Sequence, residues 1–307
     1  MIAFVILNYN TWEMTISCVD SIFDTCNLEY TIYIVDNGST NGSYQKLKEQ
    51  YQNYKNVVVF ENENIGYARG NNTGIRAAIH DGHQFITITN NDVIFLEESI
   101  ENMYTFLQKH QDAAVAAPCV LSTEGKLRDL PTLKPLKTSD YFSYNTKLRY
   151  IASSKGERQF EQEYYLQPDE IKNEPIPIYK FSGCCFMATS EMWEKIGLFD
   201  ENTFLYYEED ILSSKMQQSG CKAYYLPNSK VVHHHGLTTG KDNLFVDTEM
   251  VKSELYFLSN YHQLPFLGLL FIYIDRAITP IMKKMRKRYN LTLKDYLAYL
   301  KKTWNHL

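Results

Sequence analysis

The sequence predicts an α/β fold built on a mostly parallel, Rossmann-like sheet. Within residues 1–120, short apolar runs rich in β-branched residues alternate with segments whose apolar residues recur at helical spacing. Polar clusters follow several of these runs, as expected where parallel strands end at a ligand-binding crevice. We therefore expect helices flanking the sheet and a binding site at the carboxyl ends of its strands.

Five strands and four helices are predicted in this first part of the chain. Because the carboxyl ends of parallel strands meet at one edge of a sheet, the polar clusters that follow them should face one crevice. The strands are expected at residues 2–7, 30–35, 57–60, 85–88 and 113–117, and the helices at residues 12–23, 43–51, 69–80 and 97–110. The three clusters are Asn8-Tyr9-Asn10, Asp36-Asn37-Gly38-Ser39-Thr40 and Asn90-Asn91-Asp92.

The middle of the chain interrupts this pattern. Periodicity fades between residues 130 and 177 into Pro, Lys, Tyr and Ser, which predicts an irregular insertion with one short helix. Regular elements resume after it. A strand is expected at residues 181–187, and a helix follows that begins at its expected cap, Ser190, and ends at Gly197. A second helix is expected at residues 208–218, before Gly220, and two strands at residues 222–226 and 230–232.

The last part of the chain changes character at Leu264. A bilayer span needs about 20 predominantly apolar residues, and the apolar segment 264–282 is broken by prolines, a glycine and the pair Asp275-Arg276. A basic run at residues 283–288 follows at once. This order favours an interfacial helix that contacts an anionic membrane surface. The alternative is a packed C-terminal helix with a solvated basic end.

Composition and charge narrow the functional classes. The chain has 307 residues, 44% hydrophobic and 22% charged, enough for one large core or two smaller ones. A formal net charge of −5 argues against nonspecific nucleic-acid binding. The six cysteines show no metal-binding spacing and indicate reduced, mostly buried thiols of a cytoplasmic protein. The apolar first seven residues lack a basic flank, so they predict a strand rather than a signal peptide.

Two loops offer groups that could bind a nucleotide. Asp36 follows a strand, where its carboxylate could accept from a pyrimidine N3–H or a ribose hydroxyl, although its surroundings are also an ordinary turn sequence. Residues 64–72 form a Gly- and Asn-rich loop that opens a helix and could present N–H groups and Arg69 to a diphosphate. The loop lacks Gly-x-Gly-x-x-Gly spacing and a Gly-Lys-Ser/Thr sequence, which disfavours dinucleotide and P-loop binding.

Asp92 and a histidine run are the candidate metal ligands. Mg²⁺ is commonly held by one or two carboxylates together with substrate phosphates, so Asp92 suffices if one more ligand arrives from elsewhere. In the run His233-His234-His235, strand alternation points the first and third side chains to the same face. The structural alternatives are a turn at Asp92 and a solvated strand end at the histidines. The spacing does not resemble that of a zinc site.

Three consecutive acids, Glu208, Glu209 and Asp210, stand at the start of a predicted helix. The helix macrodipole favours acidic residues there, so a purely structural explanation exists. Three acids nevertheless exceed what capping needs. A carboxylate beside a divalent ion can act as general base when a hydroxyl is pressed against an electrophilic carbon.

Together these segments resemble the family 2 glycosyltransferases, most closely the rhamnosyltransferase-type branch that builds bacterial surface polysaccharides. The resemblance covers about residues 2 to 240. It implies a GT-A fold, a nucleotide-diphosphate sugar donor, Mg²⁺ or Mn²⁺ as cofactor, and inversion at the anomeric carbon. The segments that carry it are Ile6-Leu7-Asn8-Tyr9-Asn10, Ile34-Val35-Asp36-Asn37-Gly38-Ser39-Thr40, Gly66-Tyr67-Ala68-Arg69-Gly70-Asn71-Asn72, Thr89-Asn90-Asn91-Asp92, Ser182-Gly183-Cys184-Cys185-Phe186, Glu208-Glu209-Asp210 and Val231-Val232-His233-His234.

The resemblance assigns metal and nucleotide roles. Asp92 matches the last acid of the metal-binding DxD motif, with Asn90 in place of its first acid, and His233 matches a histidine that joins the metal site. Tyr9 and Asp36 match positions that hold the base and the ribose. The full set expected to bind the nucleotide is Asn8, Tyr9, Asp36, Arg69, Asn71 and Asn91.

The resemblance also points to the catalytic base. Counting back from Gly220 places the family's acidic pair on Glu208 and Glu209, which makes Glu209 the expected base and Asp210 its rival. The implied mechanism is a single displacement, in which the base takes the acceptor proton as the hydroxyl attacks the donor sugar and the nucleotide diphosphate leaves.

The expected organisation has three parts. Residues 1–120 should form the nucleotide-sugar-binding half of the GT-A domain, residues 121–240 the acceptor-binding and catalytic half, and residues 241–307 a helical extension. The resemblance suggests dTDP-rhamnose or a UDP-hexose as donor and a glycan or lipid-linked acceptor at the cytoplasmic face of the membrane, with the oligomeric state open. Two alternatives remain: transfer to polyprenyl phosphate, which would need little base, and a noncatalytic nucleotide-sugar-binding protein.

Overall fold

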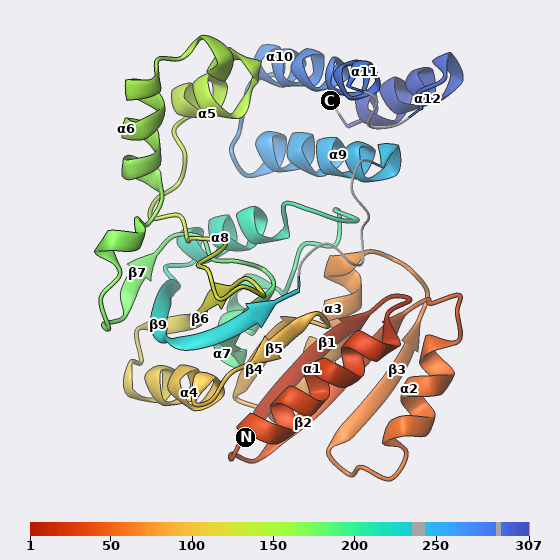
Figure 1. Cartoon of the computed structure of the whole chain (residues 1–307), viewed down its shortest axis with the longest axis vertical. Coiled ribbons are helices and arrows are strands. Elements are labelled where there is room, and N and C mark those ends of the chain that lie inside the picture. Colours follow the sequence, from red (N-terminus) through yellow and green to blue (C-terminus); the bar gives the residue numbers. More distant parts are fainter. Residues whose placement is uncertain (235–242, 287–289, 307) are drawn as a thin grey trace.

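The structure is a computed structural model that describes residues 1–234, 243–286 and 290–306 (Figure 1). Within these residues a mixed sheet runs in the order β3-β2-β1-β4-β8-β6-β9-β5, and β7 also pairs with β9. Helices flank the sheet, and a layer of C-terminal helices is stacked above it in the view of Figure 1. The predicted α/β class with a helical extension is therefore confirmed.

The first four strands form the parallel part of the sheet. Each is longer than predicted, because the polar residues at its end continue the ladder. Asn8 pairs with Asp36, and Leu7 pairs with Asn90, so three polar strand ends lie side by side. The strands are β1 (Ile2–Asn8), β2 (Tyr30–Asn37), β3 (Val57–Asn62) and β4 (Phe85–Asn90), joined by α1 (Trp12–Thr25), α2 (Ser43–Tyr51) and α3 (Tyr67–His80).

Alternating strand residues supply two cores, one on each face of the sheet. In β1, Phe4 and Ile6 pack into the core beneath α1, α2 and α4 (Ser99–Lys109), whereas Ala3 and Val5 pack into the other core. That second core includes residues of α3, α7 (Ser190–Ile196) and α8 (Glu208–Gln218). The helix that carries the three acids is therefore packed against the sheet.

The second half of the sheet is mainly antiparallel. β8 pairs with β4 and β6 in antiparallel fashion, and β9 runs parallel to β6. The two strands predicted at residues 222–226 and 230–232 are one strand, because residues 227–229 form a bulge opposite Pro118 and Cys119. The strand at residues 93–95, β5, is not predicted, because three residues are too few to show the alternation of a strand. The strands are β5 (Val93–Phe95), β6 (Ala113–Leu121), β7 (Ile176–Ile178), β8 (Cys185–Thr189) and β9 (Lys222–His233).

The insertion between β6 and β7 is more helical than predicted. It contains two α-helices and two short 3₁₀ helices, where the sequence suggested one short helix. Tyr144 stacks on Phe160 at 4.4 Å between ring centroids, and Ser153 accepts a hydrogen bond from the N–H of Gly156 at 3.1 Å. Aromatic packing and a cap thus stabilise helices in a segment that is mostly polar. They are α5 (Thr138–Asn145), η1 (Lys147–Ile151), α6 (Ser154–Tyr164) and η2 (Pro168–Glu170).

The two predicted helices after the insertion are present. α7 ends at Gly197, which has a left-handed φ of 74°, and α8 covers the predicted residues. The predicted cap of α7 was off by one residue. Thr189 rather than Ser190 is the cap, because its hydroxyl accepts from the N–H of Met192 at 3.2 Å.

Four helices build the C-terminal layer. α9 (Leu244–Asn260) lies between the α/β part and the outer helices α10 (Phe266–Ala277), α11 (Thr279–Met285) and α12 (Leu293–Trp304) (Figure 1). A third core joins them, with Leu255 of α9, Ile272 of α10 and Tyr299 of α12 all buried. None of the helices in the described ranges is both long and apolar enough to cross a bilayer. Residues 287 and 288 of the predicted basic run lie outside those ranges.

The pair Asp275-Arg276, which interrupts the apolar segment, is part of a buried ionic network. The Arg276 guanidinium donates to both carboxylate oxygens of Glu254 on α9, at 2.6 and 2.7 Å, and to Asp275 at 2.6 Å. Lys147 of the insertion pairs with Asp275 at 3.1 Å, and the Tyr141 hydroxyl donates to Glu254. The charges thus face the protein interior.

Candidate functional site

Asn8, Asp36 and Asn91 form a buried polar layer at the strand ends. The Asn8 amide donates to Asp36 at 2.6 Å and accepts from Thr15 at 2.8 Å. Asp36 also accepts from the backbone N–H and the hydroxyl of Ser39, at 3.0 and 2.7 Å. The Asn91 amide donates to hydroxyls on the first turn of α1. These hydrogen bonds hold the strand ends together and fix the position of the Asp36 carboxylate.

The other three residues predicted to bind the nucleotide, Tyr9, Arg69 and Asn71, differ in solvent exposure. Tyr9 is 36% exposed beside Asn8. Arg69 is half-exposed at the start of α3 and interacts with Glu201, donating to its carbonyl at 3.3 Å. Asn71 is fully buried; its amide donates to the carbonyl of Tyr67, and its Oδ1 has no hydrogen-bond partner. Tyr9 and Arg69 are thus the members of the set whose side chains reach solvent.

Strand pairing brings Asp92 and His233 together. Val93 of β5 pairs with His233 of β9, and the N–H of His234 donates to the Asp92 carbonyl at 2.9 Å. His233 Nε2 consequently lies 3.2 Å from Oδ1 of Asp92. Both side chains are buried, and that Asp92 oxygen makes no hydrogen bond of good geometry. The third histidine of the run, His235, lies outside the described residues.

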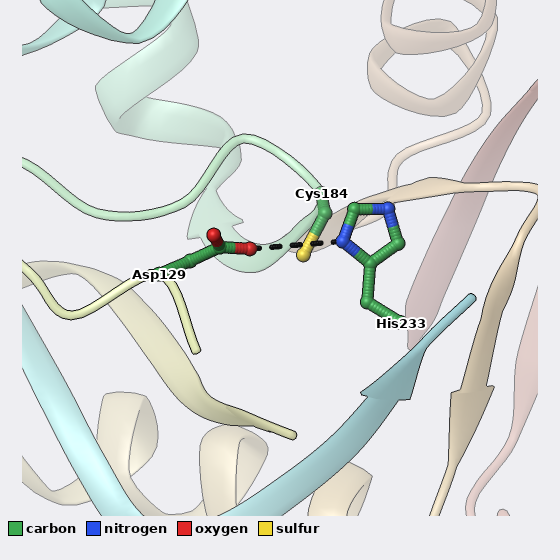
Figure 2. Close-up of side chains that lie close together, drawn as sticks. All are labelled: Asp129, Cys184 and His233. Atoms are coloured by element: carbon green, nitrogen blue, oxygen red, sulfur yellow. Dashed lines mark ion pairs between the residues drawn. The ribbon is translucent and has the colours of Figure 1, made fainter. Parts of the chain in front are cut away.

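The other nitrogen of His233 faces two residues that the sequence analysis did not assign. Its Nδ1 lies 3.7 Å from Oδ2 of Asp129, and Cys184 approaches between them (Figure 2). One ligand atom from each of the three residues lies within 4.8 Å of the others. Asp129 precedes the irregular insertion and carried no sequence signal. Cys184 was read as a buried thiol, and its position inside a motif of the resemblance was the only hint.

The surroundings of His233 favour its charged form in the absence of a metal. Burial disfavours the imidazolium, but hydrogen bonds to Asp129, Asp92 and Cys184 raise the pKa of His233 to about 12. Because each ring nitrogen faces a different carboxylate, a single ion can use only one of them. The Nε2 side offers a buried carboxylate oxygen of Asp92 at 3.2 Å, which suits a hard cation such as Mg²⁺ or Mn²⁺. The Nδ1 side offers a thiol, which suits softer ions.

The three acids occupy the first turn of α8, after two residues in left-handed backbone conformations, Tyr206 at φ 75° and Tyr207 at φ 65°. Asp210 pairs with Lys180 at 2.8 Å. Burial and the neighbouring Glu209 raise the pKa of Glu208. Burial also raises the pKa of Glu209, while backbone N–H groups and Lys180 oppose the shift.

Glu209 lies against the loop that leads into β8. A Cβ built on Gly183 would lie 2.7 Å from both Cγ and Cδ of Glu209, so a glycine leaves room for the carboxylate. The hydroxyl of Tyr67 donates to the Gly183 carbonyl at 3.1 Å and to Asn90 at 3.2 Å. We call His233, Asp129 and Cys184 the His233 cluster. Because the residue after Gly183 is Cys184, one short loop contacts both Glu209 and this cluster.

A cavity of about 210 Å³ opens beside α8. It lies between the insertion, α8 and the end of α9, and Asp210 and Lys180 form part of its wall. A third of the other lining residues are tyrosines: Tyr141, Tyr165, Tyr179, Tyr207 and Tyr261. Aromatic faces together with charged and hydroxyl groups are the kind of lining that could bind a polar organic ring.

Known sequences and structures are similar to this chain. The sequence profile of Glycosyl transferase family 2 matches residues 3–197. Glycosyltransferase GlyG of Streptococcus pneumoniae is 33% identical over 206 residues, which cover 66% of this chain and 60% of the relative. The N-acetylglucosaminyl-diphospho-decaprenol L-rhamnosyltransferase of Mycobacterium tuberculosis is 24% identical over 241 residues, 76% of this chain and 75% of the relative.

A solved structure shares the fold. The crystal structure of GalNAc-T7 with UDP, GalNAc and Mn²⁺ superimposes with a TM-score of 0.62 at 16% sequence identity. The match covers 84% of this chain but 47% of that chain, so this chain spans about half of its length. At this identity the likeness concerns the fold alone.

Proposed function

This chain belongs to Glycosyl transferase family 2 and is a glycosyltransferase of the GT-A fold, and we propose that it is an inverting, metal-assisted enzyme. In this proposal it moves a sugar from a nucleotide-diphosphate donor to a hydroxyl of a glycan or lipid-linked acceptor. The observation that carries the proposal is the loop at Gly183 and Cys184, which contacts Glu209 on one side and the His233 cluster on the other. In a single displacement, the general base and the site of the leaving diphosphate must lie close to each other, and one short loop connects them here.

We assign Asp92 and Nε2 of His233 as the protein ligands of Mg²⁺ or Mn²⁺. The buried Asp92 oxygen that lies 3.2 Å from this nitrogen supports this choice, because the two atoms could face one ion. Asp129 then orients the imidazole through Nδ1, the usual role of a carboxylate behind a metal-binding histidine. When bound, the ion offsets the charge that develops on the leaving diphosphate.

We assign Glu209 as the general base and Asp210 as a structural acid. Of the coupled pair Glu208 and Glu209, the more enclosed Glu208 retains the shared proton, because its Oε1 is buried without a hydrogen bond. Burial raises the pKa of Glu209, whereas Lys180 and backbone N–H groups lower it, and in its carboxylate form Glu209 can accept the proton of the acceptor hydroxyl. The oxygen of that hydroxyl bonds to the anomeric carbon as the bond to the diphosphate breaks. A positioned base supplies roughly 10²- to 10⁴-fold in rate.

The six nucleotide residues divide into two roles in this proposal. Tyr9 offers an aromatic face to the base, and Asp36 accepts from the base or the ribose, as their positions suggest. Asn8 and Asn91 hold the carboxylate of Asp36 and the strand ends in place. Arg69 and Asn71, at the start of α3, lie where the diphosphate would approach a helix N-terminus.

The donor is dTDP-rhamnose or a UDP-hexose in our proposal, and the acceptor is lipid-linked. The name of the Mycobacterium tuberculosis relative, an L-rhamnosyltransferase acting on a diphospho-decaprenol-linked sugar, supports both choices. The tyrosine-lined cavity beside α8 supplies room for an acceptor sugar next to the acids. The working location is the cytoplasmic face of a membrane.

A thermal-shift screen of nucleotide sugars with and without Mn²⁺ tests the proposal. A ligand that binds only the folded state raises its melting temperature, so dTDP-rhamnose or a UDP-hexose should do so more strongly with Mn²⁺ than without it. Stabilisation by no nucleotide sugar would contradict the donor class. Stabilisation that is equal in EDTA would contradict the metal assignment.

A further inference from the structure

α10 and α11 expose a continuous apolar stripe. An α-helix turns by about 100° per residue, so residues spaced alternately four and three apart lie along one side. Ile278, between the two helices, keeps a helical backbone, so the spacing carries through the junction. The residues of the stripe are between 39% and 78% exposed: Leu267, Phe271, Ile274, Ile278, Ile281 and Met285.

The opposite side of α10 faces the protein. Leu269 and Ile272 are buried in the third core, against α9. Asp275 and Arg276 lie on this inner side too, in the network with Glu254. The charges of the helix are therefore turned inward and its apolar stripe outward, the reverse of a helix on the surface of a water-soluble domain.

α12 adds a second stripe. Leu293, Leu297 and Trp304 are 73%, 56% and 49% exposed, whereas Tyr299 and Thr303, on the opposite side, are buried. Both α10 and α12 pack on α9 and on each other, and Figure 1 shows both on the same side of α9. We call the two stripes together the outer apolar face. Isolated exposed apolar residues are common, but nine in two stripes on neighbouring helices indicate a binding surface.

The part of the sequence that carries this face is basic. Residues 264–307 contain nine Lys and Arg against two Asp, a net charge of +7, while the whole chain carries −5. Lys294 and Lys301 are exposed and follow the apolar residues of α12 at positions that border its stripe. Long cationic side chains at the edge of an apolar helix face can extend to lipid headgroups.

We propose that the outer apolar face docks on the surface of an anionic lipid bilayer. No helix in the described residues is long and apolar enough to span a bilayer, so α10 and α11 would lie in the interface with their stripe inserted. A second copy of the chain is a poorer occupant, because two such faces would bring like charges together. The inference adds a partner to the proposed function by placing the catalytic site near a lipid-linked acceptor, but the face itself does not rest on the donor or the reaction.

Vesicle sedimentation of the full chain tests the proposal. The probes are phosphatidylcholine vesicles with and without phosphatidylglycerol. The triple variant Leu267→Gln, Ile274→Gln, Leu293→Gln changes three exposed side chains and should bind the anionic vesicles at least about tenfold more weakly than the wild type. Val58→Gln, which changes an exposed apolar residue of β3 far from the face, is the matched control and should bind like the wild type.

A second pair of measurements separates charge from apolar contact and from folding. Lys294→Gln with Lys301→Gln should weaken binding to the anionic vesicles and leave the weaker binding to phosphatidylcholine alone unchanged. Melting temperature and oligomeric state are measured for every variant.

The proposal is overturned if the wild type does not sediment with anionic vesicles or if the folded triple variant sediments equally. It is also overturned if the triple variant dissociates a wild-type dimer that does not bind vesicles. If the wild type did not turn over the donor, the result would contradict the proposed function but not the docking of this face.

Discussion

At the residue scale, the surroundings of Glu209 and Asp210 separate two acids that are adjacent in sequence. Asp210 forms an ion pair with Lys180 and lines the cavity beside α8. Glu209 lies against Gly183, next to the residue that joins the His233 cluster. A general base must reach the proton of the acceptor hydroxyl, and our proposal gives this role to Glu209 because it lies beside the loop of the His233 cluster.

We expect Glu209→Gln to lower kcat by at least about 10²-fold with little change in donor affinity, because a base acts in the transition state. Asp210→Asn should lower kcat less, since it removes a partner of Lys180 rather than the base. Steady-state kinetics and isothermal titration of the donor would measure both effects. A larger loss in Asp210→Asn would make Asp210 the base.

Glu208 should make stability depend on pH. Burial and Glu209 raise its pKa in the folded state, so the folded protein binds this proton more tightly than the unfolded chain does. The contribution is fully present below the ordinary pKa of glutamate and is lost as the pH rises toward the raised value, at no more than about 1.4 kcal/mol per pH unit. Glu208→Gln should therefore gain stability relative to the wild type as the pH rises.

Urea unfolding at several pH values, from weakly acidic to weakly alkaline, measures this difference directly. Because Glu208 and Glu209 titrate as a pair, Glu209→Gln is the useful companion variant and should lower the pKa of Glu208. A constant difference between Glu208→Gln and the wild type across the range would mean that Glu208 is already ionised in the folded state.

Sequence reasoning found Asp92 and His233 because both stand at strand ends, where ligand-binding residues gather. It could not find Asp129, which lies in an irregular segment and reaches His233 only through the fold. Sequence reasoning also could not rank the three acids by their surroundings. Lys180 and Gly183, which contact Asp210 and Glu209, are distant from them in the sequence. Whether these residues act as assigned stays a prediction.

At the scale of elements, the start of α8 is held from the C-terminal layer. The Tyr207 hydroxyl lies 3.2 Å from that of Tyr141, which donates to Glu254 of α9. Arg276 of α10 pairs with the same carboxylate. Tyr207 has a left-handed φ of 65°, which costs free energy unless the surrounding contacts hold it. The network thus supports the turn that positions Glu209.

We expect Tyr141→Phe to lower kcat severalfold and to leave the donor KM nearly unchanged, because it releases Tyr207 without touching the donor site. It should also cost about 1–3 kcal/mol of stability. Tyr164→Phe is the matched control, since its hydroxyl donates to Asp140 in the same insertion at 2.5 Å without a link to α8. Equal kcat in the two variants would limit the network to a structural role.

The elements themselves were largely predictable where the sequence marks their ends. The bounds of α2 and α8 match the prediction, and a glycine marks one end of each helix, Gly42 before α2 and Gly220 after α8. Most helices of the insertion were not predicted, since aromatic stacking between residues distant in sequence stabilises them in a mostly polar segment. β9 was predicted as two strands because Pro227 signals a break, and only pairing with β6 shows that the chain continues through it.

At the scale of the whole molecule, three layers follow one another from the sheet to the outer helices (Figure 1). The parallel strands end at the residues that we propose bind the nucleotide and the metal, and α8 carries the three acids. α9 connects this site to α10 and α12 through a shared core and the Glu254 network. The fold therefore connects the proposed catalytic residues, through packed helices, to the surface that we propose docks on lipid.

Donor turnover in the presence of Mn²⁺, measured for the wild type and for Asp92→Ala, tests the central claim most directly. Circular dichroism and melting temperature of both proteins show whether the fold persists. We predict that Mn²⁺-dependent turnover of the nucleotide sugar is lost in folded Asp92→Ala and in wild type treated with EDTA, because the Asp92 carboxylate holds the ion beside the diphosphate. Wild-type turnover in the variant or in EDTA would contradict the account.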